Sequence, residues 1–80
     1  MIIGFENLKV GANVYIVRTG NGIDIETNTI AERRGNVLTL ENNTGVKIDF
    51  ELPMKASIAK ANDYYFVCAD IASLVKVLTN

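Results

Sequence analysis

Apolar and polar residues alternate without a break along residues 46–52, which read V-K-I-D-F-E-L. Because successive side chains of a strand point to opposite faces of a sheet, this period of two predicts a half-buried β-strand. The turn-prone sequence Asn-Asn-Thr-Gly occupies residues 42–45, and residues 37–41 form another apolar extended segment before it. We therefore expect residues 37–41 and 46–52 to form a β-hairpin.

Other segments rich in β-branched and aromatic residues predict further strands around this hairpin. Asn28 is a turn-favouring residue that interrupts the polar and apolar pattern between residues 23 and 34. Pro53 removes a backbone donor and ends the hairpin strand. The expected order is a strand at 12–19, a turn at 20–22, a short strand or loop arm at 23–27, an extended segment at 29–34, a tight turn at 35–36, the hairpin, a connector at 54–63 with a short strand near 57–59, and a strand at 64–68.

The last part of the chain has helical rather than strand periodicity. Asp70 is a good N-cap residue, and Ile71, Leu74, Val75 and Leu78 follow at positions i, i+3, i+4 and i+7. This spacing places the four apolar side chains on one face of a short helix. We expect that face to dock on the sheet.

These elements predict a mainly β fold, a small SH3-like barrel of about five antiparallel strands with a short C-terminal helix. Residues 11–17, a looped segment and then residues 29–40 resemble the strand-loop-strand opening of KOW and other SH3-like modules. The chain also resembles small uncharacterised bacteriophage proteins with a G-x-x-V-Y-[VI] strand, which residues 11–16 match. The resemblance implies a fold rather than an activity. The chain has no Trp and only Pro53, which argues against a groove for proline-rich peptides.

Composition is consistent with one small folded domain spanning residues 1–80. Apolar residues make up 49% of the chain, and mean hydropathy is +0.18, which is high for a protein with so much surface relative to its volume. We expect some apolar surface to be left for a partner or a second copy. The net charge of -1 is that of neither a nucleic-acid-binding polycation nor an acidic DNA mimic.

The residue inventory argues against catalysis. The chain contains no His, which excludes histidine-based acid-base, metal-ligand and triad chemistry. Cys68 is the only cysteine and lies in an apolar β segment, so we expect it to be a packed core residue. A lone thiol and an apolar N-terminus without a basic leader suggest a cytoplasmic protein. We expect no enzyme activity and no cofactor.

Two carboxylate pairs have the spacing that places both side chains on one face of a strand. They are Asp24 with Glu26, and Asp49 with Glu51. If the two strands faced each other, their oxygens could hold Mg²⁺ or Ca²⁺. The alternation of the strands already predicts solvated polar residues there, and we favour that interpretation. Gly20-Asn21-Gly22 lacks the following Lys-Ser or Lys-Thr and helix of a phosphate-binding loop, so we interpret it as a turn.

The remaining candidates are basic and aromatic residues on exposed faces. Arg33 and Arg34 are neighbours beside a turn, so at least one guanidinium should be exposed and free for a phosphate or carboxylate. Tyr15 alternates with Val14 and Ile16, and its ring should lie outside the core. The candidate interaction residues are Tyr15 with its expected neighbours Arg18 or Lys47, Arg33, Arg34, and Tyr64 and Tyr65 of the aromatic run, where at least one ring is exposed unless the helix covers it.

Three functions are compatible with these features. The first is a non-enzymatic protein-interaction module that modulates a host protein through an exposed sheet face or edge, with a phage as its candidate source. The second is a nucleic-acid-binding module of the SH3 or KOW type that uses Arg18, Arg33, Arg34 and Lys47 with Tyr15. The third is a homo-oligomer that binds a small anionic ligand between subunits. We favour the first.

Overall fold

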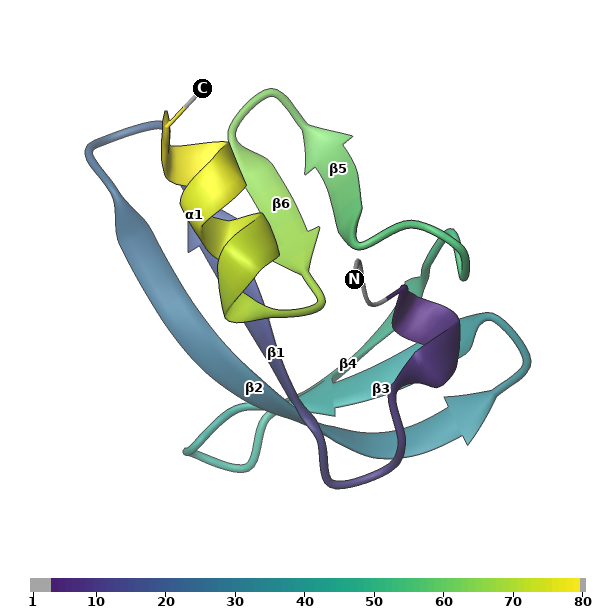
Figure 1. The fold of residues 1–80 in the computed structure, drawn as a ribbon. Helices are drawn as coiled ribbons and strands as arrows, with labels where there is room; N and C mark the ends of the chain where they lie inside the picture. Colours follow the sequence, from purple (N-terminus) through teal and green to yellow (C-terminus); the bar gives the residue numbers. More distant parts are fainter. Residues whose placement is uncertain (1–3, 80) are drawn as a thin grey trace.

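The computed structural model describes residues 4–79 and shows a single antiparallel sheet with one helix packed on it (Figure 1). Within these residues the six strands are arranged in the order β4-β3-β2-β1-β6-β5, so β4 and β5 are the end strands. The elements along the chain are the 3₁₀ turn η1 (Phe5–Asn7), β1 (Asn13–Arg18), β2 (Asp24–Arg34), β3 (Val37–Glu41), β4 (Lys47–Glu51), β5 (Ile58–Asn62), β6 (Tyr65–Cys68) and the helix α1 (Ile71–Thr79).

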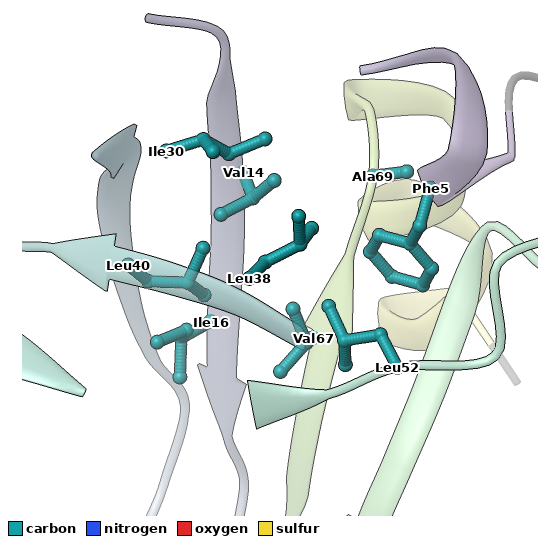
Figure 2. Close-up of a cluster of buried hydrophobic side chains, with 9 residues drawn as sticks. All are labelled: Phe5, Val14, Ile16, Ile30, Leu38, Leu40, Leu52, Val67 and Ala69. Carbon is teal, nitrogen blue, oxygen red and sulfur yellow. The ribbon is translucent and has the colours of Figure 1, made fainter. Parts of the chain in front are cut away.

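The sheet curls into a half-barrel, and its concave face carries the hydrophobic core. Side chains from β1, β2, β3 and β6 point into this face, as the alternation of each strand requires. Figure 2 shows them gathered with Phe5 of η1 and with Leu52, which follows β4. A mainly β fold with a short C-terminal helix is therefore confirmed. The buried cluster consists of Phe5, Val14, Ile16, Ile30, Leu38, Leu40, Leu52, Val67 and Ala69.

The segment around η1 closes one end of the half-barrel. The Phe5 N–H donates to the Ala56 carbonyl (2.9 Å), and the Glu6 N–H donates to the Met54 carbonyl (2.7 Å). Gly4 allows this approach, because a Cβ at this position would lie 3.0 Å from the Met54 carbonyl oxygen. The sequence pattern assigned no structural role to Gly4 or Phe5. Residues 1–3 of the apolar N-terminus lie outside the described residues.

The predicted hairpin is confirmed as β3 and β4. Asn42 organises its turn, because its side-chain oxygen accepts hydrogen bonds from the backbone N–H groups of Thr44 and Val46, both at 3.0 Å. Gly45 supplies the positive φ of 85° that the turn needs. The alternation of the strand and the chemistry of its turn therefore determine this part of the fold.

The prediction that Asn28 interrupts the extended pattern is wrong. Residues 24–34 form one long strand, β2, in which Asn28 is buried and pairs with Val14 of the neighbouring strand β1. The Asn28 amide donates to the Glu26 carboxylate at 3.0 Å, so its polar group is satisfied within the strand. Pairing with β1 thus overrides the turn preference of asparagine. A bulge between Ile30 and Glu32 shifts the register instead.

The described residues form six strands, in agreement with the expected count of about five. The 54–63 connector contains β5, which is longer than the short strand expected near residues 57–59. Its sequence Ile-Ala-Lys-Ala-Asn has little intrinsic β preference. Pairing with β6 keeps it extended, with a second bulge between Lys60 and Asn62.

The predicted helix is present, but it docks through a different face. Asp70 caps it by accepting a hydrogen bond from the Ser73 N–H at 2.8 Å. Ser73 is buried and Leu74 is partly buried, whereas Ile71 and Val75 remain 60% and 51% exposed. Since six of the nine helical residues are apolar, periodicity did not identify the docking side. The short link from the buried end of β6 leaves little freedom in how the helix is rotated on the sheet.

No helix formed by the described residues has both the length and the apolar character needed to span a bilayer.

Candidate functional site

Three of the predicted interaction residues meet in one cleft, where the β1–β2 loop lies beside the β5–β6 turn. The cleft has a volume of about 410 Å³. The Thr19 N–H donates to the Tyr64 carbonyl at 2.9 Å and holds the two loops together. Tyr64 is 62% exposed, and its ring lies against Gly20. The cleft is lined by Arg18, Gly20, Asn21, Gly22, Asp24, Asn62, Tyr64 and Tyr65.

Arg18 connects the charged and aromatic sides of this cleft. Its guanidinium donates to the Asp24 carboxylate at 3.0 Å and lies 5.1 Å from the centroid of the Tyr65 ring. Tyr65 also stacks on Phe50 of β4, with a centroid distance of 6.2 Å. The Arg18 guanidinium is therefore already engaged in an ion pair with Asp24 and a cation–π contact with Tyr65. The cleft has aromatic walls but little net positive charge.

Arg33 and Arg34 have different roles, although they are neighbours in the sequence. Arg33 donates from one guanidinium nitrogen to the Glu6 and Leu8 carbonyls, each at 2.8 Å, and so fastens the segment around η1 to β2. Arg34 lies on the outer face and donates to Asp49 of β4 at 2.9 Å. The expectation of a free guanidinium at this turn is wrong for both residues, because each one binds a group of the protein.

Tyr15 does not lie beside Arg18 or Lys47. Val14 and Ile16 are buried in the core, as predicted, so Tyr15 is on the outer face of β1 while Arg18 is on the concave face. Lys47 shares the outer face with Tyr15, but β2 and β3 separate their strands. The proposed aromatic and basic pair is therefore not formed.

The two carboxylate pairs also lie on different faces. Asp24 and Glu26 are on the concave face of β2, whereas Asp49 and Glu51 are on the outer face of β4, as the strand registers require. A cleft of about 520 Å³ beside Asp24 and Glu26 also reaches the β3–β4 turn. No group of three acidic or cysteine side chains suited to a metal ion occurs within residues 4–79.

Asp49 is held as an anion by neighbours from two other strands. Its carboxylate accepts hydrogen bonds from the Thr39 hydroxyl and from Arg34, and these bonds hold the pKa of Asp49 below its ordinary value. The hydrogen bond to Asp49 in turn raises the pKa of Arg34. The charge of Asp49 is thus compensated within the chain.

Cys68 is buried, as predicted, at the end of β6, where it pairs with Tyr15 of β1. Burial, with a smaller contribution from Asp70, raises the pKa of its thiol to about 11. The thiol is therefore protonated at neutral pH, and the thiolate needed for nucleophilic chemistry is scarce.

The outer edge of β4 is a candidate binding surface that was not identified when single residues were selected from the sequence. The Leu52 N–H donates to the Asn36 carbonyl (2.9 Å), and the Asn42 N–H donates to the Val46 carbonyl (3.0 Å), at opposite ends of the β3–β4 pair. Bonded and non-bonded positions alternate in an antiparallel pair. The backbone N–H and C=O groups of Lys47, Asp49 and Glu51 therefore point away from β3, toward the free edge.

Apolar side chains accompany this free edge. Val46 and Ile48 are 53% and 48% exposed, although their strand belongs to the hairpin that carries part of the core. A groove of about 220 Å³, lined by residues of both end strands that include Phe50 and Ile58, opens beside the last residues of β4. The alternation of residues 46–52 predicted the strand, but only the sheet order shows that this strand is at the edge.

Comparison with known proteins adds no family to this description, because no family model, curated protein or solved structure matches the chain.

Proposed function

We propose that the chain is a small non-enzymatic protein-interaction domain that binds an extended segment of a partner along the free edge of β4. The observation that carries this proposal is the edge itself. The alternate residues Lys47, Asp49 and Glu51 direct backbone N–H and C=O groups away from β3, toward the free edge. The side chain of Ile48, in the same strand, is half exposed. An added strand gains main-chain hydrogen bonds along such an edge, and alternate side chains provide specificity.

The second end strand is a poorer acceptor. Strand β5 carries a bulge between Lys60 and Asn62, and the Lys60 side chain is paired with Asp63 at 3.2 Å. A bulge opposes strand addition, because it twists the edge strand and interrupts its regular hydrogen-bonding pattern. Strand β4 has a regular register with β3 throughout. This difference favours β4 as the binding edge.

The other two functions have less support. Phosphate binding needs a cluster of available cations, but of the four cations considered for it, Arg18 and Arg34 pair with carboxylates and Arg33 binds backbone carbonyls, which leaves Lys47 without another available cation of this set beside it. A small anion in the cleft beside Tyr64 would compete with Asp24 for Arg18. The protonated, buried thiol of Cys68 fits a protein of a reducing compartment, and we place the function in the cytoplasm.

Selection of binding peptides tests this function directly. A display library of random decapeptides is selected against the immobilised protein, and the dissociation constants of the selected peptides are measured for wild type and two variants. Glu51→Pro removes one outward N–H without touching a β3–β4 hydrogen bond, and Glu51→Ala removes only the side chain. We expect peptides that bind wild type and Glu51→Ala similarly, but Glu51→Pro at least about tenfold more weakly, a loss equivalent to one good hydrogen bond.

Hydrogen exchange locates the bound peptide. Binding at the edge should slow exchange of the Lys47 and Asp49 amides, whereas binding in the tyrosine cleft should slow exchange around residues 19–22. Urea unfolding of Glu51→Pro verifies that the variant is folded. Peptides that bind Glu51→Pro as well as wild type, or a selection that yields no binder, would overturn the proposed function.

A further inference from the structure

The strand at the free edge has a sequence that is complementary to itself. In residues 46–52, V-K-I-D-F-E-L, apolar residues occupy every second position on both sides of Asp49. Lys47 lies two residues before Asp49, and Glu51 lies two residues after it. If the segment is turned end to end, Lys47 meets Glu51, Asp49 meets its own copy, and each apolar residue meets an apolar residue. A sequence of this kind can pair with an identical antiparallel strand.

We infer that the partner strand is β4 of a second copy of this chain, paired antiparallel about a two-fold axis at Asp49. This inference rests on the proposed function, since it names the partner for the same edge. Lys47 of one copy lies opposite Glu51 of the other, and this pair occurs twice by symmetry. Ile48 lies opposite Phe50 in the same way. The two sheets become one continuous sheet across the axis.

The backbone supports this register. Lys47, Asp49 and Glu51 are the residues whose N–H and C=O groups point to the free edge. In the inferred register each of them faces another residue of the same set, so every outward group finds a partner. A register shifted by one residue would place outward groups opposite inward ones. It would also put apolar side chains opposite charged ones.

One other register must be distinguished, because it also pairs opposite charges. With the axis at Ile48, Lys47 would face Asp49 of the second copy, and Glu51 would face no charged residue of the partner strand. This alternative pairs fewer outward backbone groups, since Glu51 would lie beyond the end of the partner strand. Asp49 already binds Arg34 and Thr39, which leaves Glu51 as the better match for Lys47. The axis at Asp49 is therefore favoured.

The axis brings two copies of Asp49 opposite each other, but each is compensated. Arg34 of the same chain donates to its carboxylate at 2.9 Å. The net charge of -1 per chain gives the two copies little overall repulsion. Because a two-fold contact consumes the β4 edge of both copies and β5 is interrupted by its bulge, the association closes as a dimer rather than growing into a fibre.

Exchange of the two charges tests the register. Sedimentation equilibrium is measured from low micromolar to millimolar protein for wild type, Lys47→Glu, Glu51→Lys and the double variant. We expect wild type to form a dimer, and each single variant to raise the dimer dissociation constant at least about tenfold, because both symmetry-related pairs become like charges. The double variant exchanges the charges, restores both pairs and should dimerise within about threefold of wild type. Urea unfolding provides the matched control that all four proteins are folded.

Each outcome has a distinct meaning. A dimer weakened by Lys47→Glu but not by Glu51→Lys would place the axis at Ile48 and overturn the inferred register. A wild-type protein that is monomeric at millimolar concentration would overturn the inference as a whole. If such a monomer still bound selected peptides in a way that Glu51→Pro weakened, the proposed function would stand with a different partner. Loss of both behaviours would overturn the two together.

Discussion

The closed end of the half-barrel and the free edge of β4 differ in how completely their side chains and backbone groups are covered. At the closed end, the completely buried ring of Phe5 fills the core, and Arg33 ties the adjoining backbone to β2. At the β4 edge, Ile48 remains half exposed, and the backbone groups of Lys47, Asp49 and Glu51 point outward. The same hairpin therefore contributes to the buried core through Leu38 and Leu40 and also carries the half-exposed β4 edge.

This difference separates stability from recognition. At the closed end, Phe5 has lost contact with water completely, so its removal leaves a cavity. Arg33 is exposed, but its removal leaves two backbone carbonyls without their hydrogen-bond donor. Side chains at the β4 edge are already hydrated, and their replacement changes little in the folded monomer. Variants of the closed end should therefore alter unfolding, whereas variants of the edge should alter binding. Three of the four measurements that follow test this division and one tests the cap of α1; they are given in decreasing order of expected effect.

Phe5→Ala should have the largest effect on stability. Phe5 is completely buried, and truncation of a buried phenylalanine to alanine costs about 3–5 kcal/mol. Ile48→Ala is the matched change at the edge and should cost less than about 1 kcal/mol, because its side chain is half exposed. Urea unfolding followed by circular dichroism compares the two. Similar losses for both variants would show that the closed end is not the more important part of the core.

Arg33→Met should have the next largest effect. Methionine keeps much of the aliphatic stem but loses the hydrogen bonds to the Glu6 and Leu8 carbonyls, and we expect a cost of about 1–2 kcal/mol. Arg34→Met is the control, since it breaks only an exposed ion pair and should stay within about 0.5 kcal/mol of wild type. Amide exchange at Phe5 and Glu6 should quicken in the first variant only. Equal behaviour of both variants would contradict the assignment of Arg33 as an anchor.

Asp70→Ala should have a moderate effect, because α1 loses its N-cap. Loss of such a cap destabilises the helix by about 1 kcal/mol, which makes local opening of α1 about fivefold more frequent. Because the buried Cys68 thiol reacts only when it becomes accessible, its modification by iodoacetamide should be faster by the same factor. Asp70 also contributes to the raised pKa of Cys68, so its removal could change thiol reactivity directly. Asp70→Asn separates the two causes, because asparagine caps the helix without the charge. Acceleration by Asp70→Asn as large as by Asp70→Ala would assign the effect to charge rather than capping.

The parts of the fold that local sequence predicted are those with a local cause. The β3–β4 hairpin follows from strict alternation and from the Asn42 turn, and the helix follows from the Asp70 cap. The continuity of β2 through Asn28 could not be predicted in this way, since it depends on pairing with β1 and on a hydrogen bond to Glu26. The extent of strand β5 could not be predicted for the same reason, because its extended conformation depends on pairing with β6.

The candidate surfaces were partly predictable for a related reason. Arg18, Tyr64 and Tyr65 were each chosen for their own chemistry, but their meeting in one cleft depends on the pairing of β1 with β6, which are far apart in the sequence. At least one of Arg33 and Arg34 was expected to be free, and the anchoring of Arg33 was missed because the segment around η1 that it binds had no recognisable pattern. The free edge of β4 is likewise a property of the sheet order, which alternation within one strand does not specify.

Thr39→Val should have the smallest effect, and one that depends on pH. The hydroxyl of Thr39 is the main cause of the lowered pKa of Asp49, whose ordinary value is 3.8. In the unfolded chain Asp49 takes up a proton near this pH, whereas in the folded protein it does so only at lower pH, so this stabilisation is present above pH 3.8 and is lost as the pH falls through the folded value. Urea midpoints of wild type and Thr39→Val, measured from neutral pH to about pH 2 at concentrations that keep the protein monomeric, should therefore differ at neutral pH and converge in acid. Because Asp49 is exposed at the β4 edge, the difference should be small beside that of Phe5→Ala. A difference that stays constant down to the lowest pH would show that Thr39 acts through packing rather than through the charge of Asp49.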